Sequence, residues 1–243
     1  MTYEGGYEES AHLYDVFDDK ENIDFFKSYT EGVDKVLDIG AGTGRIACPI
    51  AEEGVEVYCV EPSPSMVEQL KRKIDEDENL IGRIMVENCD SIDFDIDEEF
   101  SLAIMSGMFD HLLNDDNRIC TLLNINKHLK KGGRLVFDVF LGYMEESESL
   151  KLADSKKEGN REYKRFIKSE RIDKDKILTT LVYKIFEDGE LIETIEQPSK
   201  VGLIKREDIH RLLKETGFEV IKEFGDYNFK PYEKGDQFCI IEA

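Results

Sequence analysis

Residues 35–51, KVLDIGAGTGRIACPIA, place three glycines within five positions, directly after a short apolar run. The apolar run predicts a buried strand, and the residues after the glycines predict a helix. Glycine at a strand-to-helix turn permits positive φ and lets a ligand approach the main chain without meeting a Cβ, next to free helical N–H groups. The stretch therefore predicts a ligand-binding turn in an α/β protein. The alternative is a tight turn with only a structural role.

The alternation of short β-branched runs with longer helical patterns extends outward from this turn over residues 33–139. Such alternation predicts βαβ units and a mainly parallel sheet covered on both faces by helices. The second helix is expected to open at Ser63 or Ser65, and the third to close at paired glycines. The predicted strands are residues 33–40, 55–61, 83–90, 100–107 and 134–140, and the predicted helices are residues 44–54, 63–75 and 116–133.

After residue 142 the pattern changes. Residues 161–197 largely alternate between polar and apolar positions, and EDGE at 187–190 is placed as a hairpin turn, which predicts antiparallel strands. A helix at 205–218 and two strands at 219–227 and 237–243 follow. The predicted fold is α/β, a doubly wound, mainly parallel seven-stranded sheet with an antiparallel β insertion before the last helix. We expect one domain over residues 1–243, with a core at about 33–142 and 205–243 and the insertion at about 143–204 over the top of the sheet.

The composition is acidic, with 54 acidic and 32 basic residues and a formal charge of -22. This charge repels a phosphate backbone, so we expect no nucleic-acid partner. No apolar run approaches the roughly 18 residues that cross a bilayer, and the N-terminus is unlike a signal peptide, so we expect a cytoplasmic protein without a membrane partner. The five cysteines form no C-x-x-C pair, which favours buried thiols. DFDIDEE at 93–99 lacks the spacing of a calcium loop, and we expect no metal.

The spacing of the glycines distinguishes two classes of ligand. A dinucleotide fingerprint reads G-x-G-x-x-G, whereas the three glycines here read G-x-G-x-G. Asp38 stands two places before the first glycine, where a carboxylate disfavours a pyrophosphate and favours an ammonium or sulfonium group. Glu61 ends the next predicted strand, where it is placed to accept both hydroxyls of a ribose, and Asp90 after the third strand is placed to accept an adenine amino group. The sequence predicts a nucleoside ligand with a cationic, amino-acid-bearing tail.

Five segments resemble the class I S-adenosylmethionine-dependent methyltransferases, particularly the small-molecule branch with sugar N-methyltransferases and glycine N-methyltransferase-like enzymes. These segments are VLDIGAGTGR (36–45), VEPSPSMVEQLKRK (60–73), ENCDSIDF (87–94), FSLAIMSGMFDHL (100–112) and LKKGGRLVFDVF (129–140). The resemblance implies a single methyltransferase domain with S-adenosylmethionine as cofactor. It also implies transfer of a methyl group to nitrogen or oxygen of a small-molecule acceptor by in-line displacement.

The resemblance also implies roles for individual residues. The implied cofactor-binding residues are Tyr14, Asp38, Gly40, Ala41, Gly42, Gly44, Arg45, Glu61, Pro62, Ser63, Met66, Asp90, Ser91, Met105 and Ser106. The implied substrate-binding residues are Phe109, His111 and Tyr232. His111, beside Asp110, and Tyr14 are the catalytic candidates, with His111 as a general base. The alternative for His111 is a helix-capping or packing role.

Other functions and uses of the chain stay open at this point. One alternative is a non-catalytic or regulatory S-adenosylmethionine-binding protein, which would have the cofactor motifs but no working acceptor pocket. A nicotinamide (NAD)-dependent oxidoreductase is opposed by the glycine spacing and by Asp38. The antiparallel insertion, with the N-terminal segment around Tyr14, is expected to form the acceptor pocket and its lid. The alternative is a homodimer surface, because exposed strand edges invite pairing.

Overall fold

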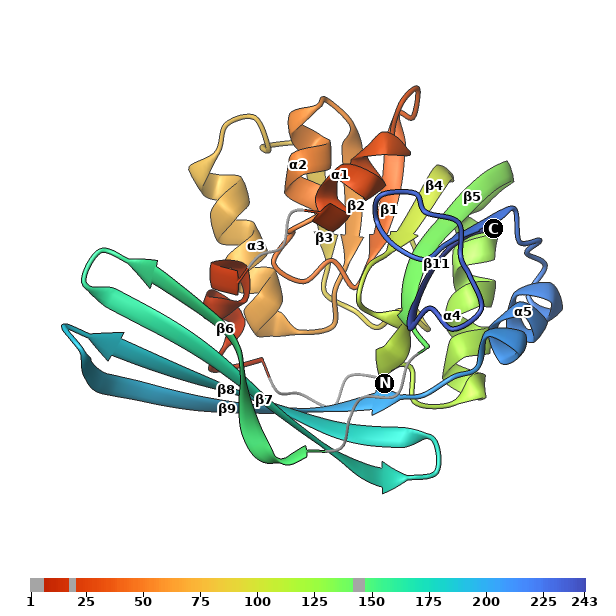
Figure 1. Cartoon of the computed structure of the whole chain (residues 1–243). Coiled ribbons are helices and arrows are strands. Elements are labelled where there is room, and N and C mark those ends of the chain that lie inside the picture. Colours follow the sequence, from red (N-terminus) through yellow and green to blue (C-terminus); the bar gives the residue numbers. More distant parts are fainter. Residues whose placement is uncertain (1–6, 18–20, 142–146) are drawn as a thin grey trace.

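A seven-stranded sheet and a separate four-stranded sheet organise the chain in this computed structural model (Figure 1). The structure describes residues 7–17, 21–141 and 147–243. The larger sheet has the strand order β10-β11-β5-β4-β1-β2-β3, in which β1 to β5 pair in parallel and β11 pairs antiparallel with both of its neighbours, β5 and β10. Its strands are β1 (Lys35–Ile39), β2 (Glu56–Val60), β3 (Ile84–Glu87), β4 (Phe100–Met105), β5 (Leu129–Phe140), β10 (Lys222–Phe224) and β11 (Phe238–Glu242). The predicted doubly wound, mainly parallel sheet of seven strands is confirmed.

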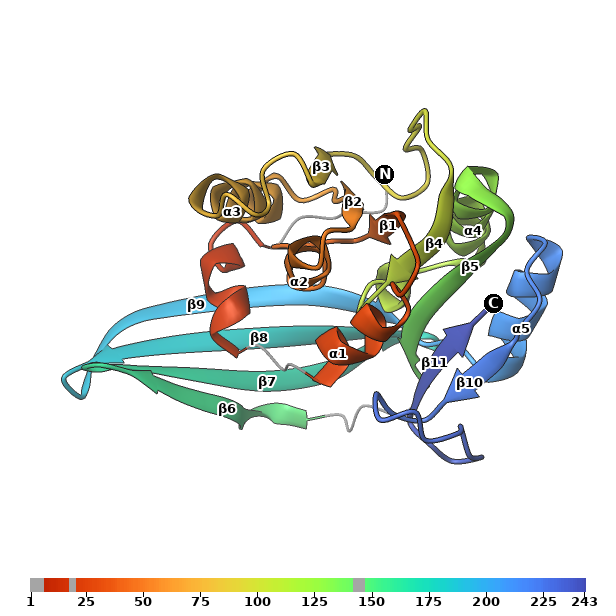
Figure 2. The ribbon, with the colours of Figure 1, turned by 90° about the horizontal axis from the view of Figure 1, so that it is seen from above.

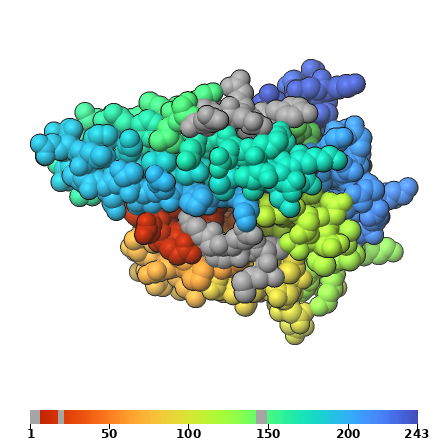
Figure 3. Space-filling model, turned by 90° about the horizontal axis from the view of Figure 1, so that it is seen from below, coloured from red at the N-terminus to blue at the C-terminus, as the bar shows by residue number. Residues whose placement is uncertain are grey.

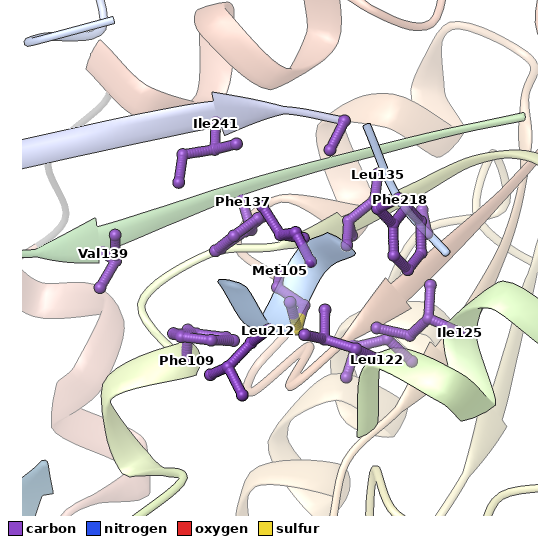
Figure 4. Close-up of a cluster of buried hydrophobic side chains, with 14 of the residues drawn as sticks. Met105, Phe109, Leu122, Ile125, Leu135, Phe137, Val139, Leu212, Phe218 and Ile241 are labelled. Atoms are coloured by element: carbon purple, nitrogen blue, oxygen red, sulfur yellow. The ribbon is translucent and has the colours of Figure 1, made fainter. Parts of the chain in front are cut away.

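Helices cover both faces of the larger sheet (Figure 2). One face carries α1 (Glu21–Ser28), α2 (Ala47–Glu52) and α3 (Pro64–Glu76), and the other carries α4 (Asp115–His128) and α5 (Arg206–Glu215). Successive strand residues alternate between these faces. In β4, Leu102 and Ile104 pack on the side of α2, whereas Ala103 and Met105 pack on the side of α4. Both faces are therefore buried, which is why the strands read as apolar runs. Figure 4 shows the core on the α4 side.

The ends of two helices test the expected capping residues. Ser63 is the N-cap of α3, where its side chain accepts a hydrogen bond from the N–H of Met66, and this confirms one of the two expected caps. The predicted closure of α4 by paired glycines is wrong. The helix ends at His128, because Leu129 is already extended and begins β5, which contains both glycines. At Gly133 a Cβ would lie 3.0 Å from the carbonyl oxygen of Phe100, so this glycine serves close strand packing. No helix in the described part of the chain has the length and apolar character to cross a membrane.

The second sheet (β6–β9, residues 147–202) is an antiparallel meander placed across the carboxyl ends of the parallel strands (Figure 1). Its strands are β6 (Ser147–Glu158), β7 (Arg161–Asp173), β8 (Lys176–Glu187) and β9 (Glu190–Gly202). The β8–β9 hairpin turns at Asp188 and Gly189 with φ of 51° and 89°, so the predicted EDGE turn is confirmed. The sequence did not predict β6, because SESLKLADSKKE is mostly polar and lacks regular alternation. The first residues of the expected insertion, 143–146, lie outside the described residues.

A short 3-10 helix, η1 (Ala11–Phe17), joins the two sheets. Leu13 packs in an apolar cluster with Tyr183 and Ile195 of the second sheet. On its other side η1 contacts the glycine turn and α3 through Asp15. The Asp15 carboxylate accepts a hydrogen bond from Thr43 of the turn at 2.7 Å and forms an ion pair with Lys73 of α3 at 2.7 Å. Figure 3 shows this N-terminal segment in red between the second sheet and the orange part of the chain. The helix was not predicted from the sequence.

Candidate active site

The carboxylate of Asp38 lies under the turn that follows β1 and is only 2% exposed. Its Oδ2 atom has no hydrogen-bond partner among the described residues. Burial raises the pKa of Asp38 to about 7; the Arg45 guanidinium lowers it, and the Glu61 carboxylate raises it. A buried acceptor that lacks a partner is costly, and a cationic partner would favour its charged form. A positively charged group placed beside Oδ2 would therefore stabilise the charged form of Asp38.

The glycines of the turn adopt backbone conformations that other residues rarely take, with φ of 74° at Gly40 and 57° at Gly42. At Gly40 a Cβ would lie 2.5 Å from Cγ of Met108, so this glycine permits the turn to pack against the segment after β4. At Gly42 no heavy atom lies within 4 Å of the Cβ position. Because Gly42 has no side chain, the space beside its main chain is open. A ligand that approaches the main chain needs such a space.

The two glycines predict different costs for the same substitution. Positive φ costs alanine about 1 kcal/mol at either position. Gly40→Ala adds an overpacking cost of about 2 kcal/mol because the new methyl group meets Met108. We therefore expect Gly40→Ala to lower the free energy of unfolding by about 3 kcal/mol and Gly42→Ala by about 1 kcal/mol. Urea denaturation of both variants measures the difference, and equal losses would contradict the packing role of Gly40.

Glu61 follows β2 and connects two loops at the carboxyl ends of the strands. Its Oε2 accepts a hydrogen bond from the N–H of Gly42 at 2.8 Å, and its Oε1 accepts one from the N–H of Ser63 at 2.8 Å. Burial raises the pKa of Glu61, whereas the two main-chain donors lower it. Each carboxylate oxygen can accept a further hydrogen bond. Glu61 thus fixes the glycine turn to the start of α3 and still has acceptor capacity for a ligand.

A cavity of about 440 Å³ opens above these residues. Its floor contains Gly40, Gly42, Glu61, Pro62, Met66 and Ser106, its side contains Tyr7, Tyr14 and His111, and its roof contains Leu178, Pro198, Ser199 and Lys200 of the second sheet. The other eight cofactor candidates are not among its lining residues, which are Asp38, Ala41, Gly44, Arg45, Ser63, Asp90, Ser91 and Met105. The structure therefore brings seven of the cofactor candidates to one cavity and places the second sheet over them.

Two of the remaining cofactor candidates have other neighbours. The side chain of Met105 is fully buried among Leu122, Phe137 and other residues of the core (Figure 4). The hydroxyl of Ser91 lies 2.9 Å from that of Thr121 in α4.

A second cavity of about 420 Å³ adjoins the first. Tyr7, Tyr14, His111 and Ser199 line both cavities and therefore mark the junction between them. The rest of the second cavity is lined mainly by polar and aromatic side chains, which are Phe17, Asn22, Arg45, Arg165, Thr179, Leu181, Tyr183, Gln197, Val201 and Tyr227. One cavity thus contains the glycine turn and Glu61, and the other offers many hydrogen-bonding groups.

His111 at this junction contacts Ser199 rather than its sequence neighbour Asp110. The Nδ1 atom of His111 lies 3.4 Å from the hydroxyl of Ser199 in β9. Asp110 instead accepts a hydrogen bond from the N–H of Phe140 at 3.2 Å, because the two residues of this 3-10 turn, η2 (Phe109–His111), face different strands. Burial lowers the pKa of His111, and a hydrogen bond with the Lys200 main chain raises it. The imidazole is therefore neutral at pH 7 and can accept a proton.

Asp138 organises a polar network that the sequence analysis missed. Its Oδ1 accepts a hydrogen bond from the N–H of Gly107 at 2.6 Å, and its Oδ2 accepts bonds from Ser106 at 3.0 Å and Tyr227 at 2.8 Å. Asn22 donates to the Ser106 hydroxyl at 3.3 Å and accepts from Arg45. An acidic residue inside the apolar run RLVFDVF was the available signal, because a buried carboxylate needs such partners. The network positions Ser106 at the first cavity and Tyr227 at the second.

Two expected substrate residues do not line either cavity. Phe109 is fully buried in the core, where its ring lies 5.0 Å from that of Phe137 (Figure 4). The Tyr232 ring lies 5.1 Å from the Arg206 guanidinium at the start of α5. We therefore leave Phe109 and Tyr232 out of the site. Tyr227 lies five positions earlier in the same C-terminal segment, and it lines the second cavity where Tyr232 does not.

Comparison with known proteins gives a consistent result at the level of sequence. Residues 36–133 match a family model described as a methyltransferase domain. An uncharacterized methyltransferase of Bacillus cytotoxicus is 30% identical over 146 residues, which are 56% of this chain and 66% of that protein. An uncharacterized methyltransferase of Anoxybacillus flavithermus is 29% identical over 145 residues, 60% of this chain and 65% of that protein. The chain spans 66% and 65% of the length of these two relatives.

Solved structures with the same fold cover nearly the whole chain. The CcbJ methyltransferase of Streptomyces caelestis has a TM-score of 0.79 at 17% identity and covers 97% of this chain and 95% of its own. The sugar N-methyltransferase KedS8 of Streptoalloteichus has a TM-score of 0.76 at 19% identity, with 98% and 94% covered. CalS10, an amino pentose methyltransferase of Micromonospora echinaspora, has a TM-score of 0.69 at 17% identity, with 99% and 93% covered. At these identities the likeness shows the fold alone.

Proposed function

We propose that the chain is a class I S-adenosylmethionine-dependent methyltransferase that transfers a methyl group to a nitrogen or oxygen atom of a small polar acceptor, and the match of residues 36–133 to a methyltransferase domain supports this. The observation that carries this proposal is the pair of adjoining cavities. One contains the glycine turn and Glu61, the other is polar, and His111 lies where they meet. The single-domain organisation with the second sheet as a lid is part of the same proposal.

The residues of the first cavity, with Asp38 under its glycine turn and Arg45 in the adjoining cavity, fit S-adenosylmethionine. The free Oδ2 of Asp38 suits an ammonium group, and the open side of Gly42 leaves room for the ligand beside the main chain. Glu61 has acceptor capacity for ribose hydroxyls, and Arg45 carries the positive charge that suits a carboxylate. Bound S-adenosylmethionine supplies a methyl group on a positively charged sulfur that needs no further activation. The protein then has to position the acceptor and exclude water.

The second cavity favours a small acceptor with several hydroxyl or amino groups. Tyrosine, threonine, serine, asparagine and glutamine side chains line it, and each can donate or accept hydrogen bonds. The names of KedS8 and CalS10 describe methyltransferases of sugars and of an amino pentose, and these proteins share the fold. We therefore propose a sugar-like or amino-sugar acceptor, held so that its nucleophilic atom lies at the junction of the cavities.

His111 is the residue we propose to take the proton that methylation of an N–H or O–H group releases. Burial keeps its imidazole neutral at pH 7, and Ser199 contacts its Nδ1 atom. Tyr14 lines the same junction and is proposed to orient the acceptor rather than to exchange protons. Since an amine that arrives neutral needs little help from a base, His111 matters more for a hydroxyl acceptor.

Calorimetry tests the proposed donor. We expect the protein to bind S-adenosylmethionine and S-adenosylhomocysteine and not NAD. Glu61→Ala should weaken cofactor binding by about 2 kcal/mol, or about thirtyfold, because the cofactor loses hydrogen bonds to a charged acceptor. Glu68→Ala, on the exposed side of α3, is the matched control and should bind as the native protein does. Circular dichroism comes first, since Glu61 also accepts hydrogen bonds from Gly42 and Ser63.

Three results would count against the assignment. Binding of NAD without S-adenosylmethionine would indicate an oxidoreductase, and unchanged affinity in folded Glu61→Ala would remove Glu61 from the donor site. Incubation with labelled S-adenosylmethionine and a panel of amino sugars, polyols and amino acids identifies the acceptor as the compound that gains the labelled methyl group. Cofactor binding with no turnover on any amine or hydroxyl acceptor would favour a regulatory binding protein.

A further inference from the structure

A third cavity of about 700 Å³ lies among the starts of α4 and α5, the end of β5 and the β7–β8 hairpin. It shares Leu113 with the first cavity but none of the glycines, the acidic residues or the aromatic residues assigned above to methyl transfer. Five cationic side chains line it, which are Arg118, Arg171, Lys174, Lys176 and Lys205. Such a concentration of positive charge is notable in a chain of formal charge -22.

Arg118 on α4 is the buried cation of this cavity, with only 5% of its surface exposed. Its Nη1 atom donates a hydrogen bond to Asp115 at 3.1 Å. Among the described residues, this is the only hydrogen bond that the Arg118 guanidinium makes. Its Nε atom is buried and has no acceptor there. Asp115 is shared, because Arg211 of α5 approaches its other oxygen at 2.6 Å. A buried guanidinium with five donors is thus served by part of one carboxylate, which leaves it short of acceptors.

The rim of the cavity adds charge and main-chain donors. Lys174 and Lys205 are exposed, and among the described residues neither ammonium has an ion-pair partner. Lys205 is also the N-cap of α5, and its side chain makes no hydrogen bond to the first turn. The N-cap side chain therefore accepts no hydrogen bond from the first main-chain N–H groups of this helix. Three acidic residues also line the cavity, which are Asp115, Asp175 and Asp208. Asp115 and Asp208 lie 2.6 Å and 3.7 Å from Arg211.

We propose that this cavity binds a phosphate group, either as the free ion or as the monoester of a small molecule. A guanidinium supplies a planar set of donors that matches a phosphate, and an uncapped helix start adds N–H groups and favourable dipole charge. The two unpaired lysines of the rim complete the set. This proposal does not depend on the methyltransferase activity, because it uses a different cavity and different side chains.

Titration with inorganic phosphate and with glycerol phosphate, followed by calorimetry on the full chain, tests the site. The double variant Lys174→Gln/Lys205→Gln should bind the tighter of the two probes at least about tenfold more weakly, since each lysine contributes a direct charge interaction. Lys214→Gln removes the same charge from the exposed far end of α5 and should leave the affinity unchanged. The tighter probe shows whether the free ion or an ester is preferred.

A second variant addresses the buried cation. Arg118→Lys keeps the charge but removes the planar set of donors, and it should lose phosphate binding while S-adenosylmethionine binding stays normal. If Arg118→Lys does not fold, the exposed double variant still decides. Equal phosphate affinity in the double variant and the native protein would overturn the proposal, as would failure of the native protein to bind either probe at millimolar concentration. Loss of cofactor binding alone would affect the proposed function and leave this site untouched.

Discussion

At pH 8 the variant Asp38→Asn is expected to bind S-adenosylmethionine about 100-fold more weakly than the native protein, because a charge-assisted hydrogen bond to a buried carboxylate is lost. At pH 5 the two proteins should bind with similar affinity. The reason is that burial raises the pKa of Asp38 to about 7, so the native carboxyl is itself neutral at pH 5. Asparagine reproduces the shape of this neutral form.

The sign of the pH dependence follows from this raised pKa. Cofactor binding favours the charged form of Asp38, so below pH 7 binding must release a proton, and affinity should rise by up to about tenfold per pH unit between pH 5 and pH 7. Above pH 7 it should level off. Without the cofactor, a raised acid pKa means that stability is lost as pH rises from about 4 towards 7, so Asp38→Asn should have a higher Tm than the native protein at pH 8. Calorimetry and thermal denaturation across this range measure both effects.

A matched control separates Asp38 from other carboxylates. Asp34→Asn removes an exposed carboxylate just before β1 and should retain the native affinity and pH profile. A pH profile that persists unchanged in Asp38→Asn would show that another group, such as Glu61, causes it. Equal loss of affinity at pH 5 and pH 8 would contradict the charge argument and leave only a steric role.

Thr179→Trp is expected to reduce methyl transfer by more than about 100-fold, since a misplaced or excluded acceptor forfeits the contribution of proximity and orientation. Thr179 lies on the inner side of β8 and lines the second cavity but not the first. An indole at this position would fill much of the space of about 420 Å³ that we assign to the acceptor. Affinity for S-adenosylmethionine should change little, because the donor cavity is unaltered. Steady-state kinetics with the acceptor found in the panel, together with cofactor calorimetry, measures the contrast.

Thr194→Trp provides the control for Thr179→Trp with the same change of side chain at an exposed position of β9. It should retain activity if the second sheet acts as a lid over the acceptor. If Thr194→Trp instead reduced activity and the mass in solution while Thr179→Trp remained active, the sheet would be a homodimer surface. Analytical ultracentrifugation of the native protein and both variants distinguishes these uses.

The parts of the fold that the sequence predicted have strong local signals. Residues 35–51 combine an apolar run with glycines that require positive φ, and the structure has a strand, a turn and a helix there. Ser63 caps α3, and Asp188 and Gly189 turn the β8–β9 hairpin, because each position needs a particular backbone conformation. β6 and η1 lack such signals. Their structure depends on pairing with β7 and on packing against residues far along the chain.

The candidate site divides in the same way. The donor side was predictable because its residues follow strand ends, whose positions in a parallel sheet are known from the pattern alone. For the acceptor side the sequence indicated only the insertion and the segment around Tyr14. It did not show which side chains of β8, β9, α1 and the C-terminal segment line the second cavity, because these elements meet only in the tertiary structure. Tyr232 and Tyr227 illustrate the limit. Both lie in one loop-rich segment, and only the three-dimensional path of that segment shows that Tyr227 faces the second cavity.

The attachment of η1 has a consequence for how ligands enter. Each strand pair of the second sheet closes over a short hairpin, whereas the contact of Leu13 with Tyr183 joins parts of the chain separated by most of its length. Long-range contacts of this kind carry the largest loop-closure entropy and form late in folding. Local opening draws on the least stable contacts, so we expect η1 to detach before either sheet loses its hydrogen bonds. Release of η1, which carries Tyr14 at the junction of the two cavities, would then uncover this junction without unfolding the cavity walls.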